Sequence, residues 1–222
     1  MTIALSEISY NCDVRTLYEI DLGEGHKISL CDFVYEPAED SWLILELMKD
    51  SLNRQEETLA TCIDVGTGTG IQGITCLLSM KVAYAVLTDV SPCALKCARL
   101  NIAKNRLEHQ ADLVQCNRLD CVRKGDVAVY NLPYLPVTDE WAGLEGLQWS
   151  GGREEAIAFI YDTTSKGFKI IGLTFSSLAG NDAELRQEFE RKGYKLYATR
   201  RMHVFFEDII AMVFQRKEEN ED

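Results

Sequence analysis

The segment Asn131-Leu132-Pro133-Tyr134 combines residue types that could present a planar nitrogen to a methyl donor. The nitrogen of an amide or an exocyclic amine is a poor nucleophile because its lone pair is delocalised. A site favours its reaction by accepting both N–H bonds, and the Asn131 side-chain oxygen and the Leu132 carbonyl oxygen are two suitable acceptors. Because Leu132 precedes a proline, its backbone is biased towards an extended geometry that helps to present this carbonyl. Tyr134 can stack against the planar group. We therefore expect Asn131, Leu132, Pro133 and Tyr134 to be the catalytic residues.

A glycine-rich turn at 64–70 follows a short apolar run, and a second acid, Asp89, ends the next apolar run. The glycines allow the backbone to approach a ligand closely. The spacing of Gly68, Gly70 and Gly73 also fits a dinucleotide site. However, Asp64 would repel a pyrophosphate, whereas it can bind an ammonium group, and Asp89 can accept both hydroxyls of a ribose. These features favour S-adenosylmethionine as the cofactor. The residues expected to bind it are Asp64, Gly66, Gly68, Gly70 and Asp89.

The segments around these residues alternate between strand-like and helix-like patterns. Short β-rich runs occupy 59–65, 82–88, 111–116, 127–130, 167–175, 194–200 and 205–214. Helical patterns occupy about 71–80, 91–104, 154–164 and 183–192, and another begins at Pro37 with Glu39 and Asp40 in its first turn. Such alternation predicts a parallel sheet, and the last two strands predict an antiparallel hairpin at its edge. Sheets of this kind bind ligands at the carboxyl ends of their strands.

Composition narrows the function classes. The 222 residues suffice for one domain with a sizeable core. The net charge is −12, whereas nucleic-acid enzymes usually present a basic surface, so nucleic acid is an unexpected partner. No apolar stretch is long and charge-free enough to span a bilayer, and the first residues do not resemble a secretory signal. We expect a cytoplasmic protein without membrane contact.

The eight cysteines include no C-x-x-C pair. Cys62 and Cys76 fall in apolar runs, which is typical of small core residues. Cys93 and Cys97 lie one helical turn apart, but two thiols do not make a zinc site. We therefore expect structural thiols in a reducing cytoplasm and no bound metal.

Five motifs in order resemble the HemK-type protein-glutamine N5-methyltransferases, and most closely their short eukaryotic and archaeal branch. They occupy 34–42, 64–70, 88–89, 131–134 and 149–153. The resemblance covers roughly residues 33 to 215. It implies a class I S-adenosylmethionine-dependent methyltransferase fold, which is Rossmann-like, with a mostly parallel seven-stranded sheet and a C-terminal antiparallel hairpin. We divide the chain accordingly into an N-terminal extension (1–32), a methyltransferase domain (33–216) and an acidic tail (217–222).

The resemblance also implies an activity and partners. Members of this family methylate the side-chain amide of the glutamine in the Gly-Gly-Gln motif of class I translation release factors. The short branch generally works with a small zinc-containing activator subunit that covers an apolar surface. Ser41 is assigned to the cofactor, Asn117 and Arg118 to the stretch that contacts its adenine, and Asn131 to both cofactor and substrate. We further hypothesise that Arg153 anchors the target peptide.

One departure from the family pattern keeps other functions open. Leu132 stands where the family pattern Asn-Pro-Pro-Tyr has its first proline, and it adds an N–H and loosens φ. The resulting N-L-P-Y is similar to the motif of the ribosomal RNA adenine dimethyltransferases, so a nucleic-acid adenine N6-methyltransferase is the alternative. The acidic charge, the 36–42 segment and the short C-terminus stand against it. A non-catalytic binding module would predict loss of the cofactor acids or of Asn131, and all are present.

Overall fold

A seven-stranded sheet forms the centre of the part of the chain that the structure, a computed structural model, describes: residues 12–133 and 152–218. The strand order is β5-β4-β3-β6-β7-β9-β8. Strands β3 to β7 run parallel, and β9 is antiparallel to both β7 and β8. This confirms the predicted mostly parallel sheet with its antiparallel hairpin. The strands are β3 (Leu59–Val65), β4 (Val82–Asp89), β5 (Ala111–Gln115), β6 (Val127–Asn131), β7 (Ile170–Ser176), β8 (Tyr194–Val204) and β9 (Glu207–Arg216).

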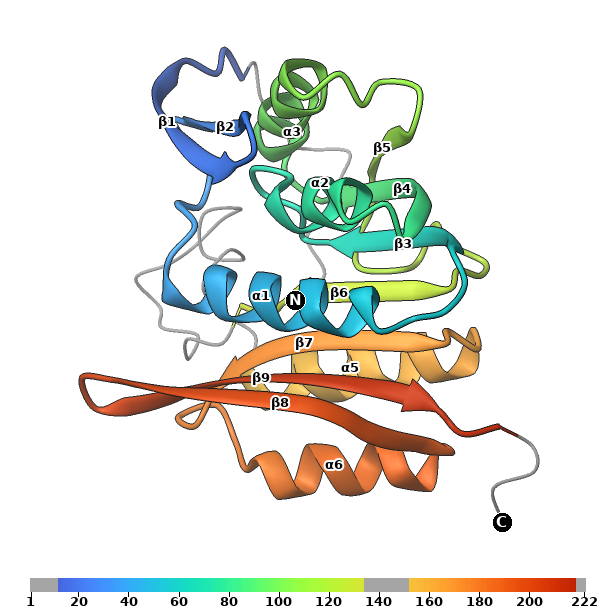
Figure 1. Ribbon diagram of the computed structural model, residues 1–222. Helices are drawn as coiled ribbons and strands as arrows, with labels where there is room; N and C mark the ends of the chain where they lie inside the picture. The colour runs from blue at the N-terminus through green and yellow to red at the C-terminus, as the bar shows by residue number, and fades with distance from the viewer. Residues whose placement is uncertain (1–11, 134–151, 219–222) are drawn as a thin grey trace.

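Helices cover both faces of the sheet (Figure 1). Side chains alternate along the strands, so Cys62 belongs to one apolar core whereas Ile63 and Val65 belong to the other. The first core packs against α1 (Glu39–Asn53), α2 (Ile71–Leu78) and α3 (Pro92–Lys104). The second packs against α5 (Gly152–Ser165) and α6 (Asp182–Arg191). Strands buried on both faces explain why the sequence shows continuous apolar runs there.

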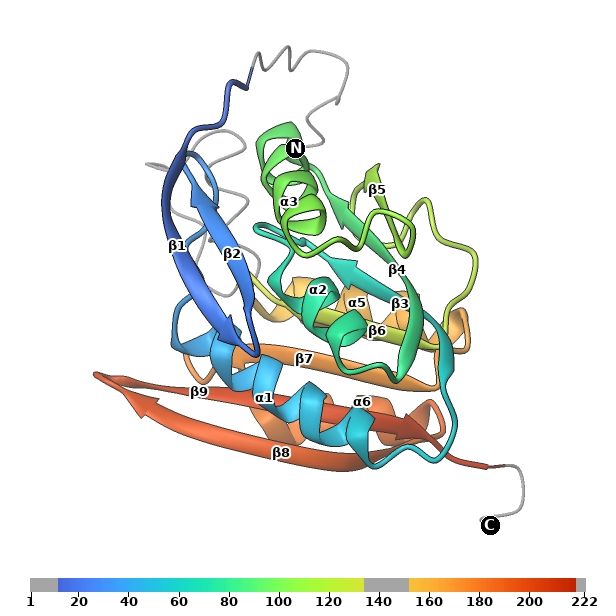
Figure 2. The same cartoon turned by 45° about the horizontal axis from the view of Figure 1, so that its top comes forward.

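A separate hairpin of β1 (Thr16–Gly23) and β2 (His26–Cys31) stands beside α3 (Figure 2). Asn101 on α3 holds the hairpin in place. Its side chain accepts from the Ser29 amide at 2.6 Å and donates to the Ser29 carbonyl at 2.9 Å. Ile28 on β2 joins the same apolar core as α1 and α2. The division of the chain at residue 32 remains a prediction.

One helix boundary and one strand boundary differ from the sequence prediction. The first helix starts at Glu39 with Ala38 as its N-cap, so Pro37 precedes the helix instead of opening it. The predicted strand at 167–175 begins only at Ile170, because the backbone around Gly167, at φ +71°, still hydrogen-bonds back to α5. By contrast, α3 begins as predicted, with Ser91 as its N-cap and Pro92 in its first turn.

The expectation that all cysteines are unpaired thiols is wrong for four of them. Disulfides join Cys12 to Cys93 and Cys116 to Cys121. The first connects residues 81 apart in the chain, a contact that local spacing cannot reveal. Cys62 and Cys76 are buried free cysteines, as predicted for core residues. Among the described residues, none of the helices is long and apolar enough to cross a membrane.

Candidate active site

A pocket of about 360 Å³ opens where the carboxyl ends of β3, β4 and β6 meet. The strand order reverses between β3 and β6, so this is the topological switch point at which such sheets bind ligands. The volume is in the range of small-molecule sites. Most of the residues predicted from the sequence line it, namely Ser41, Asp64, Gly66, Gly68, Asp89, Asn117, Arg118, Asn131, Leu132 and Pro133.

Asp64 is buried under the glycine turn and holds it in place by hydrogen bonds. Its carboxylate is only 1% exposed, and one oxygen, Oδ2, accepts from the Thr67 hydroxyl at 2.6 Å and from the Gly73 amide at 2.8 Å. Both bonds use the same oxygen, which leaves Oδ1 for a ligand. Burial, together with the nearby charge of Asp89, raises the pKa of Asp64 to about 7. A cationic ligand group beside Asp64 would therefore stabilise the ionised form of its carboxylate.

Asp89 ends the neighbouring strand and is held in the same way. Its Oδ2 accepts from the Gly68 amide at 3.0 Å, and its Oδ1 accepts from the Ser91 amide at 2.9 Å. Burial raises the pKa of Asp89 above its ordinary value. These bonds fix the carboxylate against the glycine turn, where its remaining lone pairs can accept hydroxyl groups.

Gly66 forms the part of the turn where no side chain fits. Its φ is +60°, and a β-carbon added there would lie 2.9 Å from Cε2 of Tyr130. The turn therefore offers bare backbone to a ligand, as a nucleoside-type cofactor requires. Gly70 was predicted to bind the cofactor but does not line the pocket. It is the N-cap of α2 at φ +86°, and an added β-carbon would lie 3.3 Å from Ala98, Ile74 and Leu87 atoms.

Asn131 is the end of β6, and its amide is oriented by three neighbours. The amide nitrogen donates to Asp40 at 3.0 Å and to the Ser41 hydroxyl at 3.1 Å. The amide oxygen accepts from the hydroxyl of Thr174, its partner in the ladder with β7, at 2.6 Å. Because a carboxylate can only accept, Asp40 fixes which end of the amide is nitrogen. The Asn131 oxygen keeps a second lone pair for a ligand N–H.

The first turn of α1 is itself tied down. Asp40 is 3% exposed and accepts from the Tyr35 hydroxyl at 3.0 Å and from the Ser41 amide at 2.6 Å. Gln72 on α2 donates to the Ser41 carbonyl at 2.9 Å. The helix that carries Asp40 and Ser41 thus has a fixed position relative to both the glycine turn and Asn131.

The wall formed by Asn117 and Arg118 is braced from α5. The Arg118 guanidinium pairs with Glu155 at 3.3 Å and with Asp162 at 3.1 Å, so its charge is neutralised there. Glu155 also accepts from the Tyr130 hydroxyl at 3.1 Å. The Cys116–Cys121 disulfide closes the same loop. Arg118 therefore shapes the pocket wall more than it supplies a cation to the pocket.

Two predicted residues are placed elsewhere or lie outside the described residues. Arg153 lines a separate small cavity and pairs with Glu184, to whose Oε2 its Nε donates at 3.0 Å. It was expected near the target peptide because it belongs to the 149–153 motif of the family, and that role stays a hypothesis. Tyr134 lies outside the described residues, whereas Leu132 and Pro133 line the pocket.

Several residues of the site were missed in the sequence analysis. Five of them line the pocket, namely Tyr35, Asp40, Gln72, Glu155 and Glu207, and Thr174 stands behind Asn131 as its hydrogen-bond donor. Thr174 lies near the carboxyl end of the fifth predicted strand, so the rule that ligands bind at carboxyl ends could have found it. Asp40 is adjacent to Ser41, but no local pattern shows that it contacts Asn131, 91 residues away. No cluster of three or more potential metal ligands occurs in residues 12–133 and 152–218.

Comparisons with known proteins agree with this geometry. A model of the ribosomal protein L11 methyltransferase (PrmA) family matches residues 43–137, which include the glycine turn and the Asn131 segment. A protein N5-glutamine methyltransferase of Methanocaldococcus jannaschii is 30% identical over 200 residues, which are 85% of this chain and 95% of that protein. A release factor glutamine methyltransferase of Cereibacter sphaeroides is 35% identical over 89 residues, which are only 40% of this chain and 32% of that protein.

Solved structures agree on the fold. Methanocaldococcus jannaschii Trm5 in complex with adenosine superposes with a TM-score of 0.68 and 18% sequence identity. The match covers 92% of this chain and 56% of the Trm5 chain. At this identity the likeness concerns the fold alone, which is that of the class I S-adenosylmethionine-dependent methyltransferases.

Proposed function

Because this chain belongs to the protein N5-glutamine methyltransferases, we propose that it methylates the glutamine of the Gly-Gly-Gln motif in a class I translation release factor. The methyl group goes to the side-chain amide nitrogen, and S-adenosylmethionine is the methyl donor. The name of the Cereibacter sphaeroides relative supports the choice of substrate. The observation that carries the proposal is the oriented amide of Asn131 at the end of β6.

The pocket residues fit the proposed cofactor. Asp64 offers an unused carboxylate oxygen to its ammonium group, and Asp89 offers lone pairs to its ribose hydroxyls. The bare backbone at Gly66 admits the close approach of a ligand. When bound, S-adenosylmethionine supplies an electrophilic methyl group on a sulfonium.

The protein's own groups prepare the substrate amide. The Asn131 side-chain oxygen and the Leu132 carbonyl accept its two N–H bonds, which aims the nitrogen lone pair at the methyl group. Leu132 is 2% exposed, so its carbonyl is presented from a well-packed position. Holding the reacting atoms in line lowers the barrier without a general base before transfer. The surplus proton leaves the product nitrogen afterwards.

The leucine in place of the first proline does not remove an acceptor. Both residues carry a backbone carbonyl, and Leu132 keeps the restriction that Pro133 imposes on its geometry. Its backbone N–H is the only polar group that it adds. The motif with leucine at position 132 is therefore compatible with a glutamine amide as the substrate.

We also propose a small zinc-containing activator subunit and a cytoplasmic location. The subunit rests on the family resemblance of the motifs at 34–42 and 131–134, and the location follows from the proposed substrate, which acts in translation. A purified chain that is soluble, monomeric and fully active by itself would contradict the subunit.

A methyl-transfer assay tests the proposal. Labelled S-adenosylmethionine is offered with a release factor, with its Gln→Ala variant and with RNA, each with and without the candidate activator. Label on the intact release factor alone is expected, and Asn131→Ala should abolish it. Label on RNA alone, or equal label on the Gln→Ala variant, would refute the proposed substrate.

A further inference from the structure

The turn between β8 and β9 carries two exposed phenylalanines. Val204 pairs with Glu207, so Phe205 and Phe206 are the two central residues of the hairpin turn. Their exposed fractions are 88% and 94%. Phe205 has φ +52°, whereas Phe206 does not have a positive φ. A positive φ at the first central residue is typical of a type II′ turn, in which glycine is the usual occupant.

Folding alone gives no reason for these two residues. A side chain with a β-carbon at positive φ strains the backbone, and glycine would relieve that strain. Rings that are this exposed gain little from burial, so they do not compensate for the strain. Strained and exposed positions of this kind are where contacts with other molecules are found.

The tip is joined to the pocket through its next residues. Glu207 lines the pocket and accepts a hydrogen bond from Ser176 at the end of β7. The backbone of Asp208 exchanges two hydrogen bonds with Ser177, both of 2.9 Å. The same strand, β7, carries Thr174, which orients Asn131. The tip therefore has a fixed position relative to the reacting groups.

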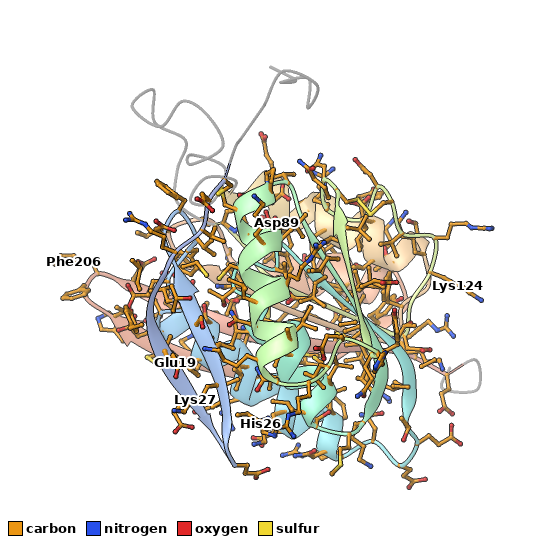
Figure 3. All side chains as sticks on the ribbon, turned by 90° about the horizontal axis from the view of Figure 1, so that it is seen from above. Glu19, His26, Lys27, Asp89, Lys124 and Phe206 are labelled. Atoms are coloured by element: carbon orange, nitrogen blue, oxygen red, sulfur yellow. A yellow bond between two sulfur atoms is a disulfide. The ribbon has the colours of Figure 1, made fainter. Side chains whose placement is uncertain are left out.

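The turn between β8 and β9 projects from the same side of the molecule as the pocket. The hairpin extends past the sheet on the side at which β3 and β7 end (Figure 1). Seen from above, the labelled Phe206 projects away from the body of the molecule (Figure 3). A molecule that places a side chain in the pocket could thus contact the tip at the same time.

The chemistry of the tip favours a protein over a nucleic acid. The two basic side chains nearest along the hairpin are Arg201 and His203, and both contact Asp208, at 3.1 Å and 2.8 Å. Glu207 adds a carboxylate at the pocket side. Phosphate groups would need unpaired cations here, whereas an apolar protein surface needs only the rings.

We propose that Phe205 and Phe206 are a docking tip for the folded protein substrate, packing against an apolar surface next to the glutamine-bearing loop. This rests on the proposed function, whose substrate it describes further. The tip supplies affinity for the intact protein, while Asn131 and Leu132 act only on the amide. A short peptide around the glutamine should reach the pocket without touching the tip.

The test compares two substrates across two variants. The double substitution Phe205→Gly and Phe206→Ser should raise KM for the intact release factor at least about tenfold, as loss of a central aromatic contact does. It should leave unchanged both the dissociation constant for S-adenosylmethionine and the kcat/KM for a short Gly-Gly-Gln peptide. The melting temperature should not fall, because glycine relieves the positive φ.

Met80 provides the matched control. It also has a positive φ, +57°, and is 83% exposed, but it lies just before β4 begins, at the opposite edge of the sheet from the pocket. Met80→Gly should leave KM for the release factor unchanged. Direct binding of the release factor, measured by calorimetry with S-adenosylhomocysteine present, gives a second reading that does not depend on turnover.

Each outcome decides the proposal. Unchanged KM and unchanged binding in the double variant, with normal methylation, would overturn the docking tip and leave the proposed function standing. Equal losses for protein and peptide would also overturn it. If the double substitution weakened binding to lipid vesicles or RNA but left binding to the release factor unchanged, the proposal would be overturned and the tip would belong to another partner. A wild-type chain that neither binds nor methylates the release factor, with the candidate activator present, would refute the proposed function, and the tip with it.

Discussion

Asp64 performs two tasks that make opposite demands on its charge. As the residue that closes the glycine turn, it is buried beneath backbone and accepts two hydrogen bonds on Oδ2. As the proposed partner of an ammonium group, it must be ionised. Burial, together with the nearby charge of Asp89, raises its pKa from an ordinary 3.8 to about 7, so near neutral pH the empty pocket holds a mixture of protonated and ionised Asp64.

This predicts a pH dependence of cofactor binding. A nearby ammonium favours the ionised form, so binding lowers the pKa of Asp64 and releases a proton below pH about 7. The affinity for S-adenosylmethionine should therefore rise as pH increases towards about 7 and level off above it. Calorimetry at several pH values, in buffers of different ionisation enthalpy, would measure both the affinity and the released proton.

Asp64→Asn is the control for that experiment. It keeps an oxygen for the Gly73 amide but cannot ionise, so it should bind more weakly and lose most of the pH dependence. The part that remains belongs to Asp89, whose pKa burial also raises. An affinity that is flat or falls between pH about 5.5 and 7 would contradict the assigned role.

At the scale of elements, the site depends on a junction between α1, β6 and β7. Asp40 on α1 and Thr174 on β7 hold opposite ends of the Asn131 amide on β6. Neither needs to touch the substrate, so both are positioning residues. If the amide turns over, it presents nitrogen where the mechanism requires an acceptor.

Asp40→Asn should therefore lower kcat much more than cofactor affinity. A second amide can donate as well as accept, so it no longer dictates the orientation of Asn131, and misplacement of this order costs about 100-fold in rate. Steady-state kinetics with a separate measurement of cofactor binding would show the split. Thr174→Ser keeps the hydroxyl and should stay close to wild type, whereas Thr174→Val should not. A weaker cofactor affinity with unchanged kcat would assign Asp40 to the cofactor instead.

Elements could be predicted from the sequence because their causes are local. Apolar runs buried on both faces indicated the strands, and Ser91-Pro92 indicated the start of α3. The strand ends then located Asp64, Asp89 and Asn131 at one edge of the sheet. The class I fold follows from this local information together with the order of the elements.

Apart from two element boundaries, the main errors and omissions involve contacts between residues far apart in the chain. The link between Asp40 and Asn131 joins residues 91 apart, and the Cys12–Cys93 disulfide joins residues 81 apart. Gly70 shares a motif with Gly66, yet helix packing, not a ligand, determines its conformation. The sequence around Phe205 does not predict that this turn lies beside the pocket, because the position of the turn depends on the pairing of β9 with β7.

On the scale of the whole molecule, the acidic excess is accompanied by arginines that are already paired. The net charge is −12. Among the described residues, Arg200 contacts Glu46 and Asp50, and Arg118 contacts two acids of α5. Nucleic-acid binding gains most of its affinity from unpaired cations that displace counterions from phosphates. Because Arg118 and Arg200 are already paired with carboxylates, they do not supply unpaired cations of this kind.

The chain should therefore bind RNA only weakly near physiological salt. Fluorescence anisotropy with a labelled ribosomal RNA hairpin, at roughly 150 mM salt, should show no saturation below about 10 μM protein, whereas specific nucleic-acid enzymes bind at nanomolar concentrations. A labelled release factor, titrated under the same conditions, should instead bind saturably through its glutamine loop, and its Gln→Ala variant serves as the reference. Saturable nanomolar RNA binding that weakens steeply with salt would show that the chain presents a phosphate-binding face after all, and would favour an adenine as the planar nitrogen held by Asn131.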